Sequence, residues 1–69
     1  MKDQVDTIIL LNLLMEEAKS LLDQAKKYQI ELNNTTDLEI GKIYADTIIF
    51  LLEHSKRLSN AAIGIANIE

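Results

Sequence analysis

Apolar side chains recur at alternating spacings of three and four residues along both halves of the chain. This spacing is typical of a helix that packs one face against another helix. The recurring positions in the first half are Ile8, Leu11, Met15, Ala18, Leu22, Ala25, Gln29 and Leu32. Those in the second half are Ile40, Tyr44, Thr47, Leu51, His54, Leu58, Ala61, Ile65 and Ile68. Because the chain has no Pro, the pattern predicts two long helices, at about residues 4–33 and 37–66.

The segment Asn-Asn-Thr-Thr-Asp at residues 33–37 separates the two patterns. Asn tolerates the left-handed conformation that ends many helices, and the segment from Thr36 to Glu39 has the spacing of a capping box. A turn at about residues 34–36 is short enough to make the helices antiparallel neighbours. We therefore predict that residues 1–69 form one domain, an all-α antiparallel two-helix hairpin. Centring it near residue 35 pairs residues whose numbers total about 70, such as Met15 with His54.

The apolar arc of each predicted helix is wider than one neighbouring helix covers. In the first helix the arc spans about 160°, whereas packing against one neighbour needs a stripe of about 100°. The surplus exceeds the apolar surface that monomers usually expose. We therefore expect two hairpins to form a homodimeric four-helix bundle with coiled-coil packing, or a tetramer. The residues expected in the core of the oligomer are Ile8, Leu11, Met15, Leu22, Thr47, Leu51, His54, Leu58 and Ile65.

Further apolar residues lie outside the predicted core. The candidates for a partner site or a second interface are Val5, Ile9, Leu13, Ile49 and Leu52. Val5, Ile9 and Leu13 form a row at i, i+4 spacing on the side of the first helix opposite its main arc. The row has two interpretations: side chains that are simply exposed or add to self-association, or a docking site for a different protein. The sequence leaves both open. It favours self-association slightly, because the row adjoins the most apolar part of the chain.

The small residues of the segment 61–66 (AAIGIA) indicate close packing beside the bulky first helix. Within this segment, Gly64 either continues the second helix or ends it.

Composition restricts the classes of function. A chain of 69 residues is expected to obtain only about 3 to 5 kcal/mol of stability from its own core, and without Cys it has no disulfide to add to this. The net charge is −4 and no basic cluster is present, which disfavours nucleic-acid binding because that binding depends on clustered cations. Two acids precede a short apolar run, a pattern that predicts neither a signal peptide nor a membrane span. We expect a cytoplasmic protein.

Candidate catalytic and metal-binding residues are few. His54 falls on the predicted seam, but no Glu or His lies three or four residues from it. We interpret it as a buried polar residue that sets the register of the helices rather than as a metal ligand. Glu16 and Glu17 lack the third carboxylate that follows such a pair in magnesium-dependent all-α nucleotide pyrophosphatases. We predict no catalytic residue, no metal, no cofactor and no enzymatic activity.

In outline the predicted hairpin resembles the small plasmid copy-number proteins that dimerise into four-helix bundles and bind RNA loops. The likeness is one of architecture without a shared motif, and RNA binding would depend on Lys19, Lys26 and Lys27 among neighbouring acids. We predict a non-enzymatic interaction or regulatory protein, such as an adaptor, an inhibitor or a small regulatory subunit. Its expected partners are a second copy of itself and another protein. A small RNA- or DNA-binding bundle is the alternative.

Overall fold

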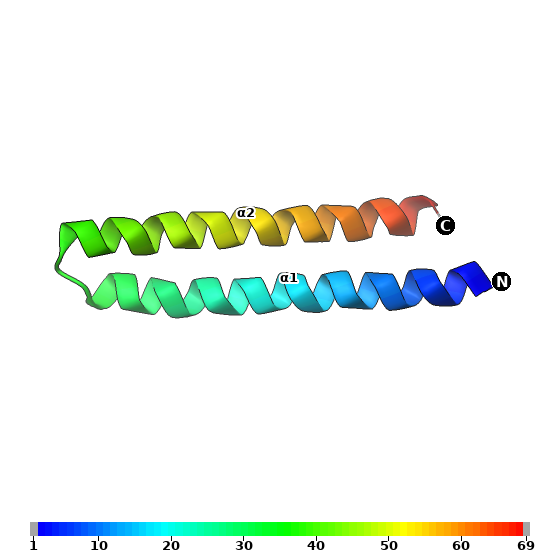
Figure 1. Ribbon diagram of the computed structural model, residues 1–69, viewed down its shortest axis with the longest axis horizontal. Coiled ribbons are helices and arrows are strands. Elements are labelled where there is room, and N and C mark those ends of the chain that lie inside the picture. Colours follow the sequence, from blue (N-terminus) through cyan, green and yellow to red (C-terminus); the bar gives the residue numbers. More distant parts are fainter. Residues whose placement is uncertain (1, 69) are drawn as a thin grey trace.

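The computed structural model describes the backbone of residues 2–68 and the side chains of residues 6–67. It consists of two helices, α1 (Lys2–Asn34) and α2 (Leu38–Ile68), which run antiparallel and side by side (Figure 1). The Cα atoms extend over 55 × 14 × 11 Å. The prediction of an all-α antiparallel hairpin is confirmed, and α2 continues through Gly64 rather than ending there.

A cap at Asp37 starts α2. The carboxylate oxygen Oδ1 of Asp37 accepts hydrogen bonds from the backbone N–H groups of Glu39, at 2.9 Å, and Ile40, at 3.2 Å. These are two of the donors that the first turn of a helix leaves without a helical partner. The predicted capping box is therefore wrong by one residue, because the Glu39 N–H donates to Asp37 and not to Thr36.

The end of α1 also differs from the prediction. No non-glycine residue in the described part of the chain has a positive φ, so neither Asn33 nor Asn34 adopts the left-handed conformation. Instead the Thr35 N–H donates to the Leu32 carbonyl at 3.3 Å, which tightens the last turn. Only residues 35–37 connect the helices, so the hairpin is centred on Thr36.

One row of side chains on each helix faces the other helix, and we call the two rows together the seam. Its residues are Thr7, Leu11, Leu14, Ala18, Leu21, Ala25, Tyr28 and Leu32 of α1 with Gly41, Tyr44, Ile48, Leu51, Ser55, Leu58, Ala62 and Ile65 of α2. All of them except Tyr28 are buried or half-buried. Leu21, Ala25 and Leu51 form the central cluster, and Ile48 and Leu58 pack against it.

Two contacts between the helices define their register. The Ser55 hydroxyl donates a hydrogen bond to the Ala18 carbonyl oxygen at 2.9 Å, and the ring centroids of Tyr28 and Tyr44 lie 5.9 Å apart. The residue numbers of these pairs total 73 and 72. The predicted total of about 70 is too low, because the turn is centred on Thr36 rather than one residue earlier.

Half of the predicted seam is displaced by one residue. Leu11, Leu51, Leu58 and Ile65 lie in the seam as predicted. In contrast, Ile8, Met15 and Leu22 are exposed on one side of the seam. His54 is exposed on the other side, where Thr47 is half-buried. Their neighbours Thr7, Leu14, Leu21, Ser55 and Ile48 take the seam positions instead.

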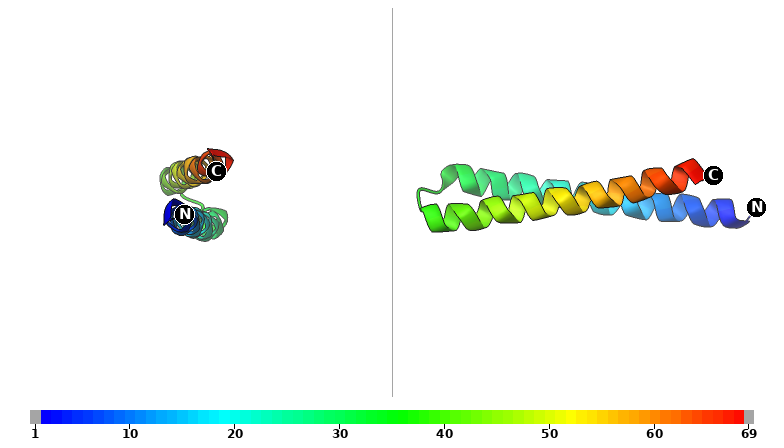
Figure 2. Two further views of the ribbon diagram at one scale, coloured as in Figure 1. Left: turned by 90° about the vertical axis from the view of Figure 1, so that its right-hand side faces the viewer. Right: turned by 90° about the horizontal axis from the view of Figure 1, so that it is seen from above.

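The close approach of the helices explains this displacement. Ser55 is 3% exposed and its short side chain reaches a main-chain oxygen of the other helix, which requires the two backbones to be near each other. Ala18 and Ala25 are also buried and alternate with Leu21 along α1, so that large and small side chains interdigitate. Figure 2 shows the helices crossing at a shallow angle. An imidazole at the Ser55 position, as in a seam through His54, would hold the helices apart.

Replacing Leu51 by Ala is expected to destabilise the protein by about 2 to 5 kcal/mol, because a buried leucine leaves a cavity when it is truncated. Leu51 is 7% exposed and lies in the central cluster. Urea unfolding followed by circular dichroism, at one fixed protein concentration, measures the loss. A midpoint equal to that of the wild type would place Leu51 outside the core.

Replacing Ser55 by Leu is expected to destabilise the hairpin by about 1 to 3 kcal/mol, because the larger side chain overfills the place where the helices approach. Ser55→Ala is the matched control. It removes one hydrogen bond but keeps the small volume, so its cost should stay within about 1.5 kcal/mol. The same unfolding experiment compares the two variants, and equal stability would contradict a close approach at Ala18.

Candidate interaction surface

Most of the large apolar side chains of this hairpin are exposed. Among the described side chains fifteen large apolar residues are exposed, whereas the buried apolar core has five residues. The accessible surface is 5521 Å², compared with about 4,400 Å² for a compact protein of this mass. The radius of gyration of 15.9 Å also exceeds the value of about 11 Å that a compact domain of this length has. The candidate site is therefore this apolar surface.

The seam divides the remaining surface into two flanks. Because the seam repeats every seven residues, the positions beside it form continuous rows on each side of both helices. The uncharged flank consists of Ile8, Met15, Leu22 and Gln29 of α1 with Ala45, Leu52, Ser59 and Ala66 of α2. The mixed flank, on the opposite side, consists of Leu10, Glu17, Gln24 and Glu31 of α1 with Ile40, Thr47, His54 and Ala61 of α2.

The uncharged flank is apolar over most of its length. Ile8, Met15 and Leu52 have exposed fractions of 57%, 53% and 44%. Ile49 and Ile63 lie beside this flank on α2, within one helical turn of its residues, and both are exposed. None of the eight flank positions holds an Asp, Glu, Lys or Arg. This side of the hairpin therefore presents an apolar strip built from both helices.

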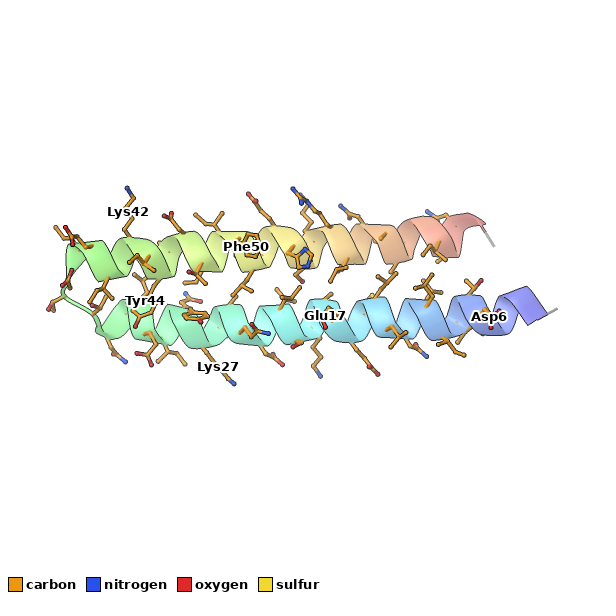
Figure 3. All side chains as sticks on the ribbon, viewed as in Figure 1. Asp6, Glu17, Lys27, Lys42, Tyr44 and Phe50 are labelled. Atoms are coloured by element: carbon orange, nitrogen blue, oxygen red, sulfur yellow. The ribbon has the colours of Figure 1, made fainter. Side chains whose placement is uncertain are left out.

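The mixed flank combines carboxylates with apolar side chains. Figure 3 shows Glu17 of α1 and Phe50 of α2 on the face turned toward the viewer, which is the side of the mixed flank, while Tyr44 lies between the helices. The Phe50 and His54 rings stack with their centroids 6.2 Å apart and an interplanar angle of 17°. His54 is exposed in the hairpin and lies beside the seam, so its predicted place in the seam between α1 and α2 is wrong, while its role in the core of an oligomer stays a prediction.

Ser55 is the buried polar residue that the sequence reasoning missed. Among the described side chains Ser55 is polar and buried, and its hydroxyl donates a hydrogen bond to the Ala18 carbonyl oxygen across the seam. A signal for it exists in the sequence, because Ser55 and Ala62 are small residues seven positions apart. Such a repeat is typical of a row at which two helices come close.

The residues predicted to form a second interface do not share one surface. Ile9 and Leu13 are exposed on α1 and lie outside the seam. Leu52 belongs to the uncharged flank, with Ile49 beside it. The side chain of Val5 lies outside the described residues. The row on α1 and the pair on α2 are therefore separate candidates for an interface.

Within residues 6–67, no group of three His, Cys, Asp or Glu side chains is placed to hold a metal ion. A hollow beside the turn is lined by Leu32, Thr35, Thr36, Asp37, Leu38, Gly41, Lys42 and Ala45. Lys19, Lys26 and Lys27 are exposed, as are the nearby acids Glu16, Asp23 and Glu31. Over the described residues, neither helix is long and apolar enough to cross a membrane.

The segment 61–66 packs less closely than predicted. Ala62 is buried in the seam, but Ala61, Gly64 and Ala66 are exposed. A Cβ atom built on Gly64 would have no heavy atom within 4 Å of it. Packing between α1 and α2 therefore does not require a glycine at this position.

The chain was also compared with known proteins. No family model, no curated protein and no solved structure shows a significant match to it.

Replacing Gly64 by Ala is expected to stabilise the hairpin by about 0.5 to 1 kcal/mol, because Ala loses less backbone freedom than Gly when a helix forms. The space around Gly64 accommodates the added methyl group. Ala61→Gly, at an exposed position of the same segment, should lower the stability by a similar amount. Thermal unfolding measures both changes, and a loss of stability in Gly64→Ala would show that another chain packs against Gly64.

Proposed function

We propose that this protein is a non-enzymatic interaction protein, an adaptor, inhibitor or small regulatory subunit, which acts through the helix-packing surfaces of a homo-oligomeric bundle. The observation that supports the proposal is the excess of exposed large apolar side chains over buried ones. Apolar surface of this extent on a small protein marks a site of association with other proteins. The functional contacts are therefore side-chain packing contacts and not bonds to a substrate.

Self-association provides the scaffold in this proposal. A hairpin with five buried apolar residues among its described side chains gains little stability by itself, since small domains bury a low fraction of their surface. Packing of a second hairpin adds buried area to both chains, and a symmetric dimer is the simplest closed assembly.

Some of the exposed apolar side chains remain available to a different protein after self-association. On α1, Ile9 and Leu13 are exposed, and on α2, Ile43 and Phe50 are exposed. Large apolar and aromatic side chains of this kind commonly supply the central contacts of an interface. Two packing surfaces on one small bundle would allow it to hold a partner while remaining assembled.

We expect the full chain to form a concentration-dependent, highly helical dimer or tetramer. The measurement is sedimentation equilibrium over a wide range of concentrations, with helicity followed by circular dichroism. A stable monomer of 7.8 kDa at every concentration would contradict the proposal, because the exposed apolar surface would then need no partner. Binding of a partner protein is tested by affinity capture. If the row of Ile9 and Leu13 is the docking site, Ile9→Gln with Leu13→Gln should abolish capture while leaving the helicity nearly intact. If the row belongs to the self-association, the same variant should lower the oligomeric state and the stability together.

A further inference from the structure

We infer that a second copy of this chain packs on the uncharged flank, so that two hairpins meet face to face as a two-fold symmetric four-helix bundle. This deepens the self-association on which the proposed function rests, by naming the surface that is used. Three features of the hairpin support this: the pattern of apolar positions around the seam, the distribution of charge between the flanks and the area left exposed.

The heptad pattern of both helices has a third apolar position on this flank. A helix in the core of a bundle needs apolar residues at about three of every seven positions. The seam supplies two of the three. On α1 the third is supplied by Ile8, Met15 and Leu22, which are spaced by seven residues, and on α2 by Leu52 with the small Ala45 and Ala66.

The α2 side of this flank holds one large side chain among small ones. Ala45, Ser59 and Ala66 occupy the same row as Leu52, and small residues let a neighbouring helix approach. Ile49 and Ile63, exposed beside the row, widen the apolar strip. Large and small side chains thus lie next to one another on this surface, as two interdigitating hairpins need.

Charge distinguishes the two flanks. Glu17 and Glu31 occupy the third heptad position of α1 on the mixed flank, with His54 on α2. A second copy packed there would bury carboxylates from both chains, which is costly unless each one is paired. On the uncharged flank the nearest cations, such as Lys19 and Lys56, stand in the next row outward. There, an ammonium group can stay in water while its alkyl stem covers apolar surface.

The total exposed area of the hairpin is large enough to supply a dimer interface. The accessible surface of 5521 Å² exceeds that of a compact protein of this mass by about 1,100 Å². If two chains each bury that excess, the interface totals about 2,200 Å², which lies in the range of stable homodimers. A second copy is therefore an occupant of suitable size for a surface that runs along the length of the hairpin.

The test compares charge substitutions on the two sides of α2. Ile49→Glu with Leu52→Glu places two carboxylates at the uncharged flank, whereas Ile43→Glu with Phe50→Glu places two on the opposite side. All four side chains are exposed in the hairpin, and the two variants have the same net charge. We expect the dimer dissociation constant from sedimentation equilibrium to rise at least about 100-fold in the first variant, since buried unpaired charge opposes association. The second variant should stay within about threefold of wild type.

The reactivity of single introduced thiols is a second measurement. It remains informative even if the charge variant that dissociates also loses its helicity. The chain has no Cys, so Leu52→Cys and Phe50→Cys each introduce a single thiol. Upon assembly, the Leu52→Cys thiol should react with a maleimide at least about tenfold more slowly, and the Phe50→Cys thiol should react at an unchanged rate. Protection of Phe50→Cys alone, or equal protection of both thiols, would overturn the assignment of the flank while leaving the proposed function intact. A wild-type monomer at all concentrations would overturn both.

Discussion

A two-helix hairpin has only one seam, and this constraint governs the whole molecule. Each helix can bury one side against the other, while the rest of its circumference faces outward. In this chain the apolar residues occupy more of the circumference than the seam covers. Among the described side chains the buried apolar core consists of Ala18, Leu21, Ala25, Leu51 and Ala62, and the larger isoleucines and leucines lie mainly outside it. The hairpin therefore exposes more large apolar side chains than it buries.

Within the seam, the contact between Ser55 and Ala18 determines how the helices fit. The hydroxyl group of Ser55 donates to a main-chain oxygen of α1, a bond that exists only if the backbones are close. Close backbones require small side chains at the points of approach, and they place the leucines in the layers between. Once this register is set, Tyr28 lies beside Tyr44. The two flanks then differ in charge, because the seam separates Met15 and Leu22 from Glu17 and Glu31.

Much of the candidate surface could be predicted from the sequence, although its position could not. Ile8, Met15 and Leu22 were predicted for the core of an oligomer, and the hairpin leaves all three exposed beside the seam. Their role in an oligomer remains a prediction. His54 and Ser55 are both polar residues on an apolar side of α2. Only Ser55 is small enough to lie between closely spaced helices.

The sequence by itself determined two long helices, a short turn and more apolar surface than one hairpin can bury. These features depend on local properties: the period of apolar residues, the absence of proline and the residues of the turn. Tertiary structure decided which of two overlapping seams is used. At Leu14 and Met15, and again at Leu21 and Leu22, neighbouring residues are both apolar, so periodicity does not distinguish the two seams. The distance between the helices does, because it admits Ser55 and excludes the imidazole of His54.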